Sequence, residues 1–213
     1  MRQAEIVEDG SIKTFAKEVR LKAFGLDLEW QNEPPSYTFL DGELEVVTGD
    51  KTDYWRKTYY DFLRDDGHFL SQSVEGDFSA EVTVQGTYEV LYDQAGLMIR
   101  LSESHWVKTG VEFTDGRMFF SVVVTNDTSD WSLLEVPIDP NGIRIRLTRH
   151  MEAIRVQYFN TRDRKWAPVR LAYLPPTARA QVGLMCCSPQ RGGFKARFRD
   201  LVIGKPIGRN LHD

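Results

Sequence analysis

The sequence predicts an all-β protein, a jelly-roll sandwich of two antiparallel sheets. Three observations predict it: apolar and polar residues alternate over many short segments, turn residues separate these segments, and few stretches have a helical repeat. A sheet with one polar face must bury its other face against a second layer, so such strands pair into sandwiches or barrels. The 213 residues fit one large domain of this kind.

The first residues carry a mixed signal. Residues 11–24 place apolar side chains at helix-like intervals behind Ser11, a residue type that caps helices. From Val19 onward, however, apolar and basic residues alternate as in a strand. A short helix and a strand both fit. We expect an N-terminal extension over residues 1–25 and a jelly-roll domain over residues 26–213.

The alternation becomes regular from Phe78, where every second residue up to Val84 is apolar. Turn sequences such as Asp115-Gly116 and Asn141-Gly142 separate the segments that follow. These segments are Leu97–Leu101, Val107–Phe113, Met118–Thr125, Ile143–Leu147, Ala153–Phe159, Val182–Cys187 and Phe194–Ile203. They read as the strands of a meander without an internal domain boundary.

One aromatic stretch interrupts this pattern. Tyr54–Arg64 could form a helix, although Asp65-Asp66-Gly67 closes it abruptly, as a loop would.

Charge is unevenly distributed along the chain. Residues 1–106 hold 10 basic and 21 acidic residues, whereas residues 107–213 hold 17 and 10, and the net charge is -4. If strands of both halves alternate within the sheets, these charges largely cancel across the surface. The pI of about 5.7 is unlike that of a nucleic-acid-binding domain, and no apolar run is long enough to span a membrane. We expect neither a nucleic-acid nor a membrane partner.

The two cysteines, Cys186 and Cys187, are adjacent. In a strand their side chains point to opposite faces, so we expect two free thiols. Free thiols and an N-terminus without an apolar signal core favour a cytoplasmic location.

A candidate site lies on the strand around residue 110. Trp106, Lys108 and Glu112 share one face, opposite Val107 and Val111. An indole can stack on the apolar face of a sugar ring, while charged groups bind its hydroxyls. The alternative is a surface ion pair between Lys108 and Glu112, which would contribute little.

Three further residues complete the predicted ligand-binding set. Arg100 joins the group if its strand pairs with the next one through residues 102–105. His68 and Trp131 flank strands where rim loops are expected. An exposed tryptophan would be informative, because large apolar groups on a surface usually meet a partner.

Other chemistry has weaker support. A glucanase-type site needs two carboxylates on one strand face, but Asp27-Leu28-Glu29 and Glu43-Leu44-Glu45 read as solvated faces. The four histidines are scattered, and Asp61, Asp65 and Asp66 lack the spacing of a calcium loop. Phosphate-loop and serine-hydrolase motifs are absent from the sequence. We predict no catalytic residue, no metal and no cofactor.

Basic and aromatic residues interleave in the segment Phe194-Lys195-Ala196-Arg197-Phe198-Arg199, as in proteins that bind single-stranded nucleic acid. A strand with its apolar side chains in the core and its basic ones in solvent explains the segment more simply.

Several segments together resemble a known family. They are Tyr92-Asp93-Gln94-Ala95-Gly96-Leu97-Met98-Ile99-Arg100, Trp106-Val107-Lys108-Thr109-Gly110-Val111-Glu112, Ser121-Val122-Val123-Val124-Thr125 and Ser129-Asp130-Trp131-Ser132. The chain resembles, over about residues 26–204, a domain-of-unknown-function family that includes the fungal "regulation of enolase" protein, within the concanavalin A-like lectin and glucanase superfamily. The resemblance implies a curved jelly roll with a concave sheet and a cytoplasmic setting, but no settled activity.

Three functions follow as hypotheses. The first is a non-catalytic module that binds a carbohydrate or polyol, and an open groove lined by aromatic residues would favour it. The second is an intracellular regulatory protein that binds a metabolic enzyme, which a flat apolar patch would favour. The third is a glycoside-active enzyme, which requires two facing carboxylates.

Overall fold

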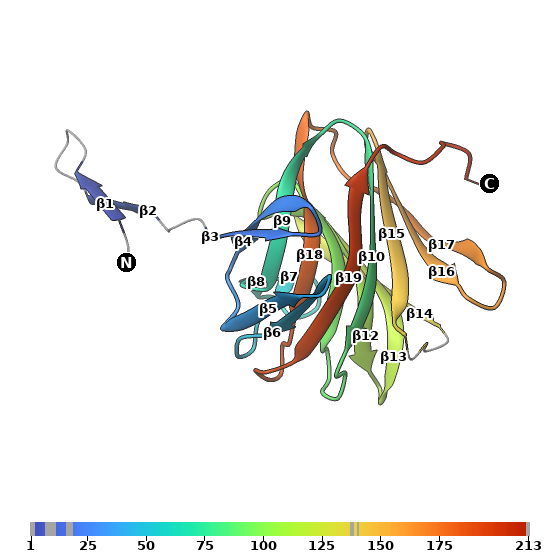
Figure 1. The fold of residues 1–213 in the computed structure, drawn as a ribbon, viewed down its shortest axis with the longest axis horizontal. Coiled ribbons are helices and arrows are strands. Elements are labelled where there is room, and N and C mark those ends of the chain that lie inside the picture. Colours follow the sequence, from blue (N-terminus) through green and yellow to red (C-terminus); the bar gives the residue numbers. More distant parts are fainter. Residues whose placement is uncertain (1–2, 7–11, 16–18, 137–138, 140, 212–213) are drawn as a thin grey trace.

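The computed structural model describes residues 3–6, 12–15, 19–136, 139 and 141–211. Every regular element in this part of the chain is a β-strand, and two large antiparallel sheets face each other (Figure 1). The predicted all-β jelly-roll sandwich is therefore confirmed. Among the same residues, no helix is long and apolar enough to cross a membrane.

The first sheet has seven strands in the order β17-β16-β15-β10-β19-β6-β5. The strands are β5 (Ser36–Leu40), β6 (Glu43–Val47), β10 (Phe78–Gly86), β15 (Ile143–His150), β16 (Ala153–Asn160), β17 (Lys165–Tyr173) and β19 (Lys195–Gly204).

The second sheet has eight strands in the order β14-β13-β12-β11-β18-β9-β4-β3. The strands are β3 (Val19–Ala23), β4 (Leu26–Gln31), β9 (His68–Glu75), β11 (Gln94–Arg100), β12 (His105–Thr114), β13 (Arg117–Asn126), β14 (Thr128–Glu135) and β18 (Arg179–Cys187).

Two hairpins stand outside these sheets. One pairs β1 (Gln3–Ile6) with β2 (Ile12–Phe15), and the other pairs β7 (Tyr54–Arg56) with β8 (Leu63–Asp65). The second hairpin replaces the helix considered for residues 54–64, because its aromatic side chains pack against the eight-stranded sheet.

The short helix considered for residues 11–24 is also wrong for the described part of that range. Residues 12–15 and 19–23 form strands, while residues 11 and 16–18 lie outside the described residues. Alternation over β3 prevails because this strand pairs with β4 and buries Ala23. The division at residue 25 stays a prediction, although β3 already belongs to the sandwich.

The strands predicted between residues 78 and 203 are all present, with ends shifted by a few residues. The segment from Phe194 follows the predicted alternation: Phe194, Ala196 and Phe198 are buried. On the opposite face, Arg197 and Arg199 pair with Glu45 and Glu43 of β6. Strand packing therefore accounts for this basic and aromatic pattern.

Both sheets mix strands from the two halves of the chain, as expected from the charge asymmetry. Ion pairs join an acidic residue of the first half to a basic residue of the second across neighbouring strands or loops. Examples are Glu81 with Arg144 and Arg146, Glu75 with Arg179, and Asp93 with Arg191. Interleaved strands thus bring the opposite charges together.

Two apolar clusters hold the molecule together. The larger lies between the sheets and includes Phe78, Leu97, Val107 and Phe120. The smaller lies on the outer face of the eight-stranded sheet, beneath the β7–β8 hairpin, and consists of Tyr54, Phe69, Met98, Trp106, Val123, Met185 and Cys187. The second cluster creates an interior on a face that would otherwise meet water.

The adjacent cysteines follow strand alternation. Cys186 belongs to the cluster between the sheets and Cys187 to the cluster under the hairpin, and both are free and buried. Burial raises the pKa of both thiols.

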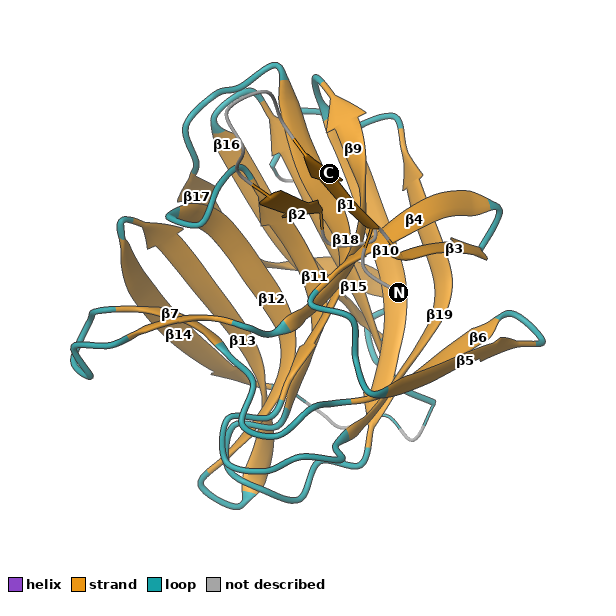
Figure 2. Cartoon of the chain, turned by 90° about the vertical axis from the view of Figure 1, so that its left-hand side faces the viewer, coloured by secondary structure: helices purple, strands orange, loops and turns teal. Residues whose placement is uncertain are grey.

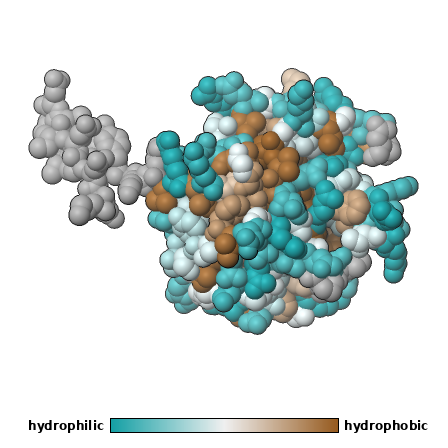
Figure 3. Space-filling view, in the orientation of Figure 1, coloured by the Kyte–Doolittle hydropathy of each residue, from teal (hydrophilic) through white to brown (hydrophobic). Residues whose placement is uncertain are grey.

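The surface seen from the side of Figure 1 is largely hydrophilic, with apolar residues gathered near its upper middle (Figure 3). The exposed edge strand β17 carries Leu171 and Tyr173.

Candidate functional site

The β7–β8 hairpin covers part of the outer face of the eight-stranded sheet. Figure 2 shows β7 beside β14, and the backbone N–H of Arg56 donates to Ser129 Oγ at 3.0 Å. Tyr54 points down into the smaller cluster, where its hydroxyl donates to the carbonyl of Gly67 at 2.6 Å. The hairpin thereby turns an open sheet face into a partly enclosed site.

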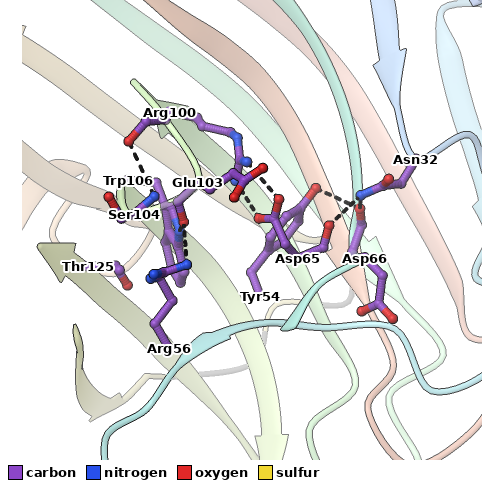
Figure 4. Close-up of polar contacts among 12 residues, drawn as sticks. Asn32, Tyr54, Arg56, Asp65, Asp66, Arg100, Glu103, Ser104, Trp106 and Thr125 are labelled. Carbon is purple, nitrogen blue, oxygen red and sulfur yellow. Dashed lines mark hydrogen bonds and ion pairs between the residues drawn. The ribbon is translucent and has the colours of Figure 1, made fainter. Parts of the chain in front are cut away.

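Arg100 and Trp106 lie beneath this cover. Arg100 donates from both terminal nitrogens to Asp65 of β8, at 2.6 and 2.8 Å (Figure 4). The Trp106 indole is fully buried and donates to the carbonyl of Glu103 at 3.1 Å. Both residues share the predicted sheet face, but they anchor the hairpin and do not line an open groove.

Lys108 is the cation at the centre of the site. Its side chain is 4% exposed and its Nζ lies 3.1 Å from Asp53 Oδ1, just before β7. Burial lowers the pKa of Lys108, but the negative charges of Asp53 and its neighbours and the hydrogen bond to Asp53 together outweigh burial and raise it. The surface pair with Glu112 that was considered as the alternative is not formed: Lys108 makes a buried pair with Asp53, because the hairpin brings that carboxylate over the sheet.

Glu112 lies four residues after Lys108, on the same face of β12, and is 4% exposed. The indole N–H of Trp131 donates to Glu112 Oε2 at 3.3 Å. Burial raises the pKa of the Glu112 carboxyl, although its hydrogen bonds and the charge of Lys108 act the other way. Glu112 is therefore a buried group and not part of an exposed ion pair.

A pocket of about 230 Å³ lies above Lys108 and Glu112. Aromatic side chains form much of its wall, and polar groups converge on its floor. The aromatic residues are Trp55, Tyr60, Phe62, Tyr92 and Trp131. The polar residues are Asp53, Gln94, Lys108, Glu112 and Gln190, and Val123 and Pro189 complete the lining.

The loop from residue 57 to residue 62 forms the outer wall. Thr58 donates its backbone N–H to the carbonyl of Arg56, and Tyr60 donates to that of Thr58. The central residues of these three-residue turns, Lys57 and Tyr59, have φ of +60° and +67°. This is the rare, strained form of the γ-turn, and such strain concentrates at functional sites.

Two contacts position the walls. The hydroxyls of Tyr60 and Tyr92 lie 3.0 Å apart and join the loop to the segment before β11. This hydrogen bond, with burial, raises the pKa of Tyr92 to about 12.

The other contact holds the loop after β18. Arg191 donates to both carboxylate oxygens of the buried Asp93, at 3.0 and 2.6 Å. Arg191 directly follows Pro189 and Gln190, which line the pocket. Asp93, part of the segment that carries the family resemblance, thus positions a wall of the pocket from outside it.

His68 does not reach this pocket. Its Nδ1 lies 2.6 Å from the carbonyl oxygen of Asn32, and its Nε2 accepts the backbone N–H of Gly49 at 2.9 Å. These contacts require a neutral ring, and burial lowers the pKa of His68. The structure gives His68 a role in joining loops.

Three of the six predicted residues, Lys108, Glu112 and Trp131, line the pocket together. Asp53, Trp55, Tyr60 and Phe62 were missed, since their stretch carried no strand alternation. The density of aromatic residues from Tyr54 to Phe62 was the available signal in the sequence. Three of them, Tyr59, Tyr60 and Phe62, are exposed, and large apolar groups on a surface usually meet a partner.

The described residues contain no group of three or more potential metal ligands. Asp65 and Asp66, two of the three clustered aspartates, bind Arg100 and Arg64.

Fold and site together define a class of protein: a jelly-roll sandwich with a pocket on the outer face of one sheet. Residues 30–206 match the family described as "Protein of unknown function (DUF1349)", and the chain belongs to this family.

The chain is similar to "Regulation of enolase protein 1" of Saccharomyces cerevisiae, with 42% identity over 185 residues that cover 86% of this chain and 92% of the relative. It is also similar to the crystal structure of a functionally unknown protein from Saccharomyces cerevisiae, at a TM-score of 0.80 and 41% identity, covering 84% of this chain and 96% of that one. The carbohydrate-binding module CBM66 from Bacillus subtilis shares the fold, at a TM-score of 0.53 and 12% identity, and the match covers 83% of this chain and 95% of that one.

Proposed function

We propose that the pocket binds one small, neutral, polyhydroxylated molecule, a single sugar ring or a polyol, without catalysis. The observation that carries the proposal is the meeting of aromatic walls and buried polar groups in one pocket of about 230 Å³. That volume lies below the roughly 300–1,000 Å³ of sites for drug-sized ligands. We therefore expect a single ring with its hydroxyls as the ligand, and not an oligosaccharide.

The aromatic walls suit the apolar face of a sugar. Trp131 is 40% exposed although it lines a pocket, so it offers surface to a ligand. Tyr60 and Phe62 also line the pocket, are partly exposed and stack on each other at 5.5 Å between ring centroids. Ring faces of this kind pack on the C–H groups of a pyranose.

The floor suits hydroxyl groups. Lys108 donates hydrogen bonds, Asp53 accepts them, and Gln94 does both. Hydrogen bonds to charged groups contribute roughly 1.5–3 kcal/mol each. Asp53 lies 3.1 Å from Lys108 and Glu112 adds a second carboxyl group, so the floor has no excess positive charge for an anion.

The likeness to a carbohydrate-binding module supports this proposal at the level of fold alone. The two buried free thiols fit the cytoplasmic location that we include in it.

Calorimetry with neutral monosaccharides and alditols tests the proposal. Wild type should bind at least one of them, and Trp131→Ala should weaken binding about tenfold or more, which corresponds to about 1.4 kcal/mol. Glu112→Gln, which keeps the shape and removes the charge, should weaken it by a similar factor.

Two matched controls are available on the surface: Tyr173→Ala removes an exposed aromatic residue of β17, and Glu135→Gln neutralises an exposed carboxylate of β14. Both should bind like wild type. The proposal would be wrong if the protein bound no member of the panel, or if all variants bound equally well. Choline and aryl glycosides belong in the panel. Preferred binding of choline would replace the proposal by a cation site, and cleavage of a glycoside would replace it by an enzyme.

A regulatory function through a metabolic enzyme is the second candidate. The name of the yeast relative favours it, together with Tyr59, which is 93% exposed in the strained loop. Sedimentation velocity with a purified enolase should then show a complex that Tyr59→Ser weakens. Sedimentation of the two proteins as separate species would count against this function.

A further inference from the structure

A second cavity lies on the opposite side of the molecule, on the outer face of the seven-stranded sheet. It measures about 620 Å³ and is lined by residues of β15, β16 and β17 on one side and of the C-terminal segment 207–211 on the other. It shares no lining residue with the pocket above Lys108.

The C-terminal segment forms a wall of this cavity because the sheet holds it in place. It leaves β19 and runs over the sheet toward the side of β16 and β17 (Figure 1). Ile207 donates its backbone N–H to Ser79 Oγ at 3.0 Å. Arg155 of β16 donates to the carbonyls of Asn210 and Leu211, at 2.9 and 3.0 Å.

Arg155 is a buried cation without a counter-ion among the described residues. It is 6% exposed, its two terminal nitrogens contact neutral carbonyls, and its buried Nε has no hydrogen-bond partner. The buried Gln157, two residues along the same strand, also has an unpartnered Oε1. Buried charges are ordinarily paired, so this site lacks a negative group.

The other charges around the cavity have the same sign. Arg146 and Lys165 line it together with Arg155, and no carboxylate of the described residues does. Glu81 pairs with Arg146 of this group, but it is shared with Arg144, at 2.7 and 3.0 Å. The cluster therefore keeps an excess of positive charge, which suits a dianion such as a phosphate monoester at neutral pH.

An aromatic surface lies beside these cations. Trp166 of β17 lines the cavity, and its ring contacts the guanidinium of Arg146, 3.8 Å from the ring centroid. Phe159 packs against the same indole at 5.5 Å and holds it in place. The cavity is within the size range of sites for small organic ligands, about 300–1,000 Å³, so there is room for more than the anion.

We infer that this cavity binds a phosphate monoester that carries a ring, with the phosphate at Arg155 and Lys165 and the ring against Trp166. This site is independent of the pocket above Lys108. Each sheet would then carry one binding site on its outer face, one for a neutral ligand and the other for an anion.

Calorimetry of the full chain with adenosine 5′-monophosphate, adenosine and inorganic phosphate tests the inference. The monophosphate should bind, adenosine should bind at least tenfold more weakly, and added salt should weaken binding of the monophosphate. Arg155→Met and Lys165→Ala should each reduce affinity at least tenfold. Arg117→Met, an exposed arginine of the other sheet, is the matched control and should bind like wild type.

Arg155→Met also removes the contacts to the C-terminal segment, so Lys165→Ala, an exposed residue, keeps the test valid if the first variant is unstable. Absence of binding to all three probes, or unchanged affinity in Lys165→Ala, would overturn the inference. Equal affinity for phosphate and the monophosphate would overturn the role of Trp166. Loss of sugar binding in Trp131→Ala with monophosphate binding intact would show that the two sites are separate.

Discussion

Buried polar residues determine how the loops of this protein meet. His68 joins the segment at Asn32 to that at Gly49 through its two ring nitrogens, and only a neutral ring can make both contacts. A protonated Nε2 cannot accept the Gly49 N–H, so protonation costs a hydrogen bond in a buried place.

We predict that this imidazole makes stability depend on pH. Because burial lowers the pKa of His68 in the folded state, its contribution is complete above the usual value of 6.5 and is lost as pH falls below it. His68→Gln should lose about 1–2 kcal/mol of unfolding free energy at pH 7.5.

Urea denaturation of both proteins from pH 8.5 to pH 5 measures this. The difference in unfolding free energy between wild type and His68→Gln should stay constant above pH 7.5, and this range serves as the control. The difference should shrink toward pH 5. A difference that does not change over the whole range would show that the imidazole is not the titrating group.

At the scale of elements, the β7–β8 hairpin makes the site. It supplies Asp53, Trp55 and the aromatic loop, and it buries Arg100 and Lys108. Its packing depends on Gly67, where an added Cβ would collide with the ring of Tyr54 and the sulfur of Cys187. The hairpin and β9 approach too closely there for any side chain.

Gly67→Ala should therefore destabilise the protein by about 1–3 kcal/mol, as overpacking does. Gly204→Ala is the matched control, because nothing lies within 4 Å of an added Cβ and its φ is not positive. Urea unfolding followed by tryptophan emission compares the two variants with wild type. Equal midpoints for both variants would mean that the hairpin can shift without cost.

At the scale of the whole molecule, two cores hold one sandwich. Cys186 lies in the core between the sheets, and Cys187 lies in the core beneath the hairpin. Both thiols are buried, and burial raises the pKa of each, which disfavours the reactive thiolate.

A thiol reagent should therefore find no reactive cysteine in the folded protein and two in denaturant without reductant. Labelling without denaturant should follow the global unfolding of the sandwich, and Cys186→Ser should lower the denatured count to one. Rapid labelling of wild type in buffer, or a denatured count below two, would contradict the placement of these residues.

The sequence alone was sufficient for the all-β sandwich, the strands after Phe78, the opposite directions of the two cysteines and the common face of Trp106, Lys108 and Glu112. Each of these follows from alternation along one strand, a local property that neighbouring residues encode. The family resemblance rested on the same segments.

Tertiary structure alone decided what that face does. Whether Trp106 meets a ligand or becomes core depends on the β7–β8 hairpin, which crosses the sheet about 50 residues away in the sequence and shows no alternation of its own. The partner of Lys108 is Asp53 and not Glu112, because the nearest opposite charge in space comes from that hairpin. Periodicity gives the direction of a side chain, but the element packed above it determines whether that direction leads to solvent, to a pocket or to a second core.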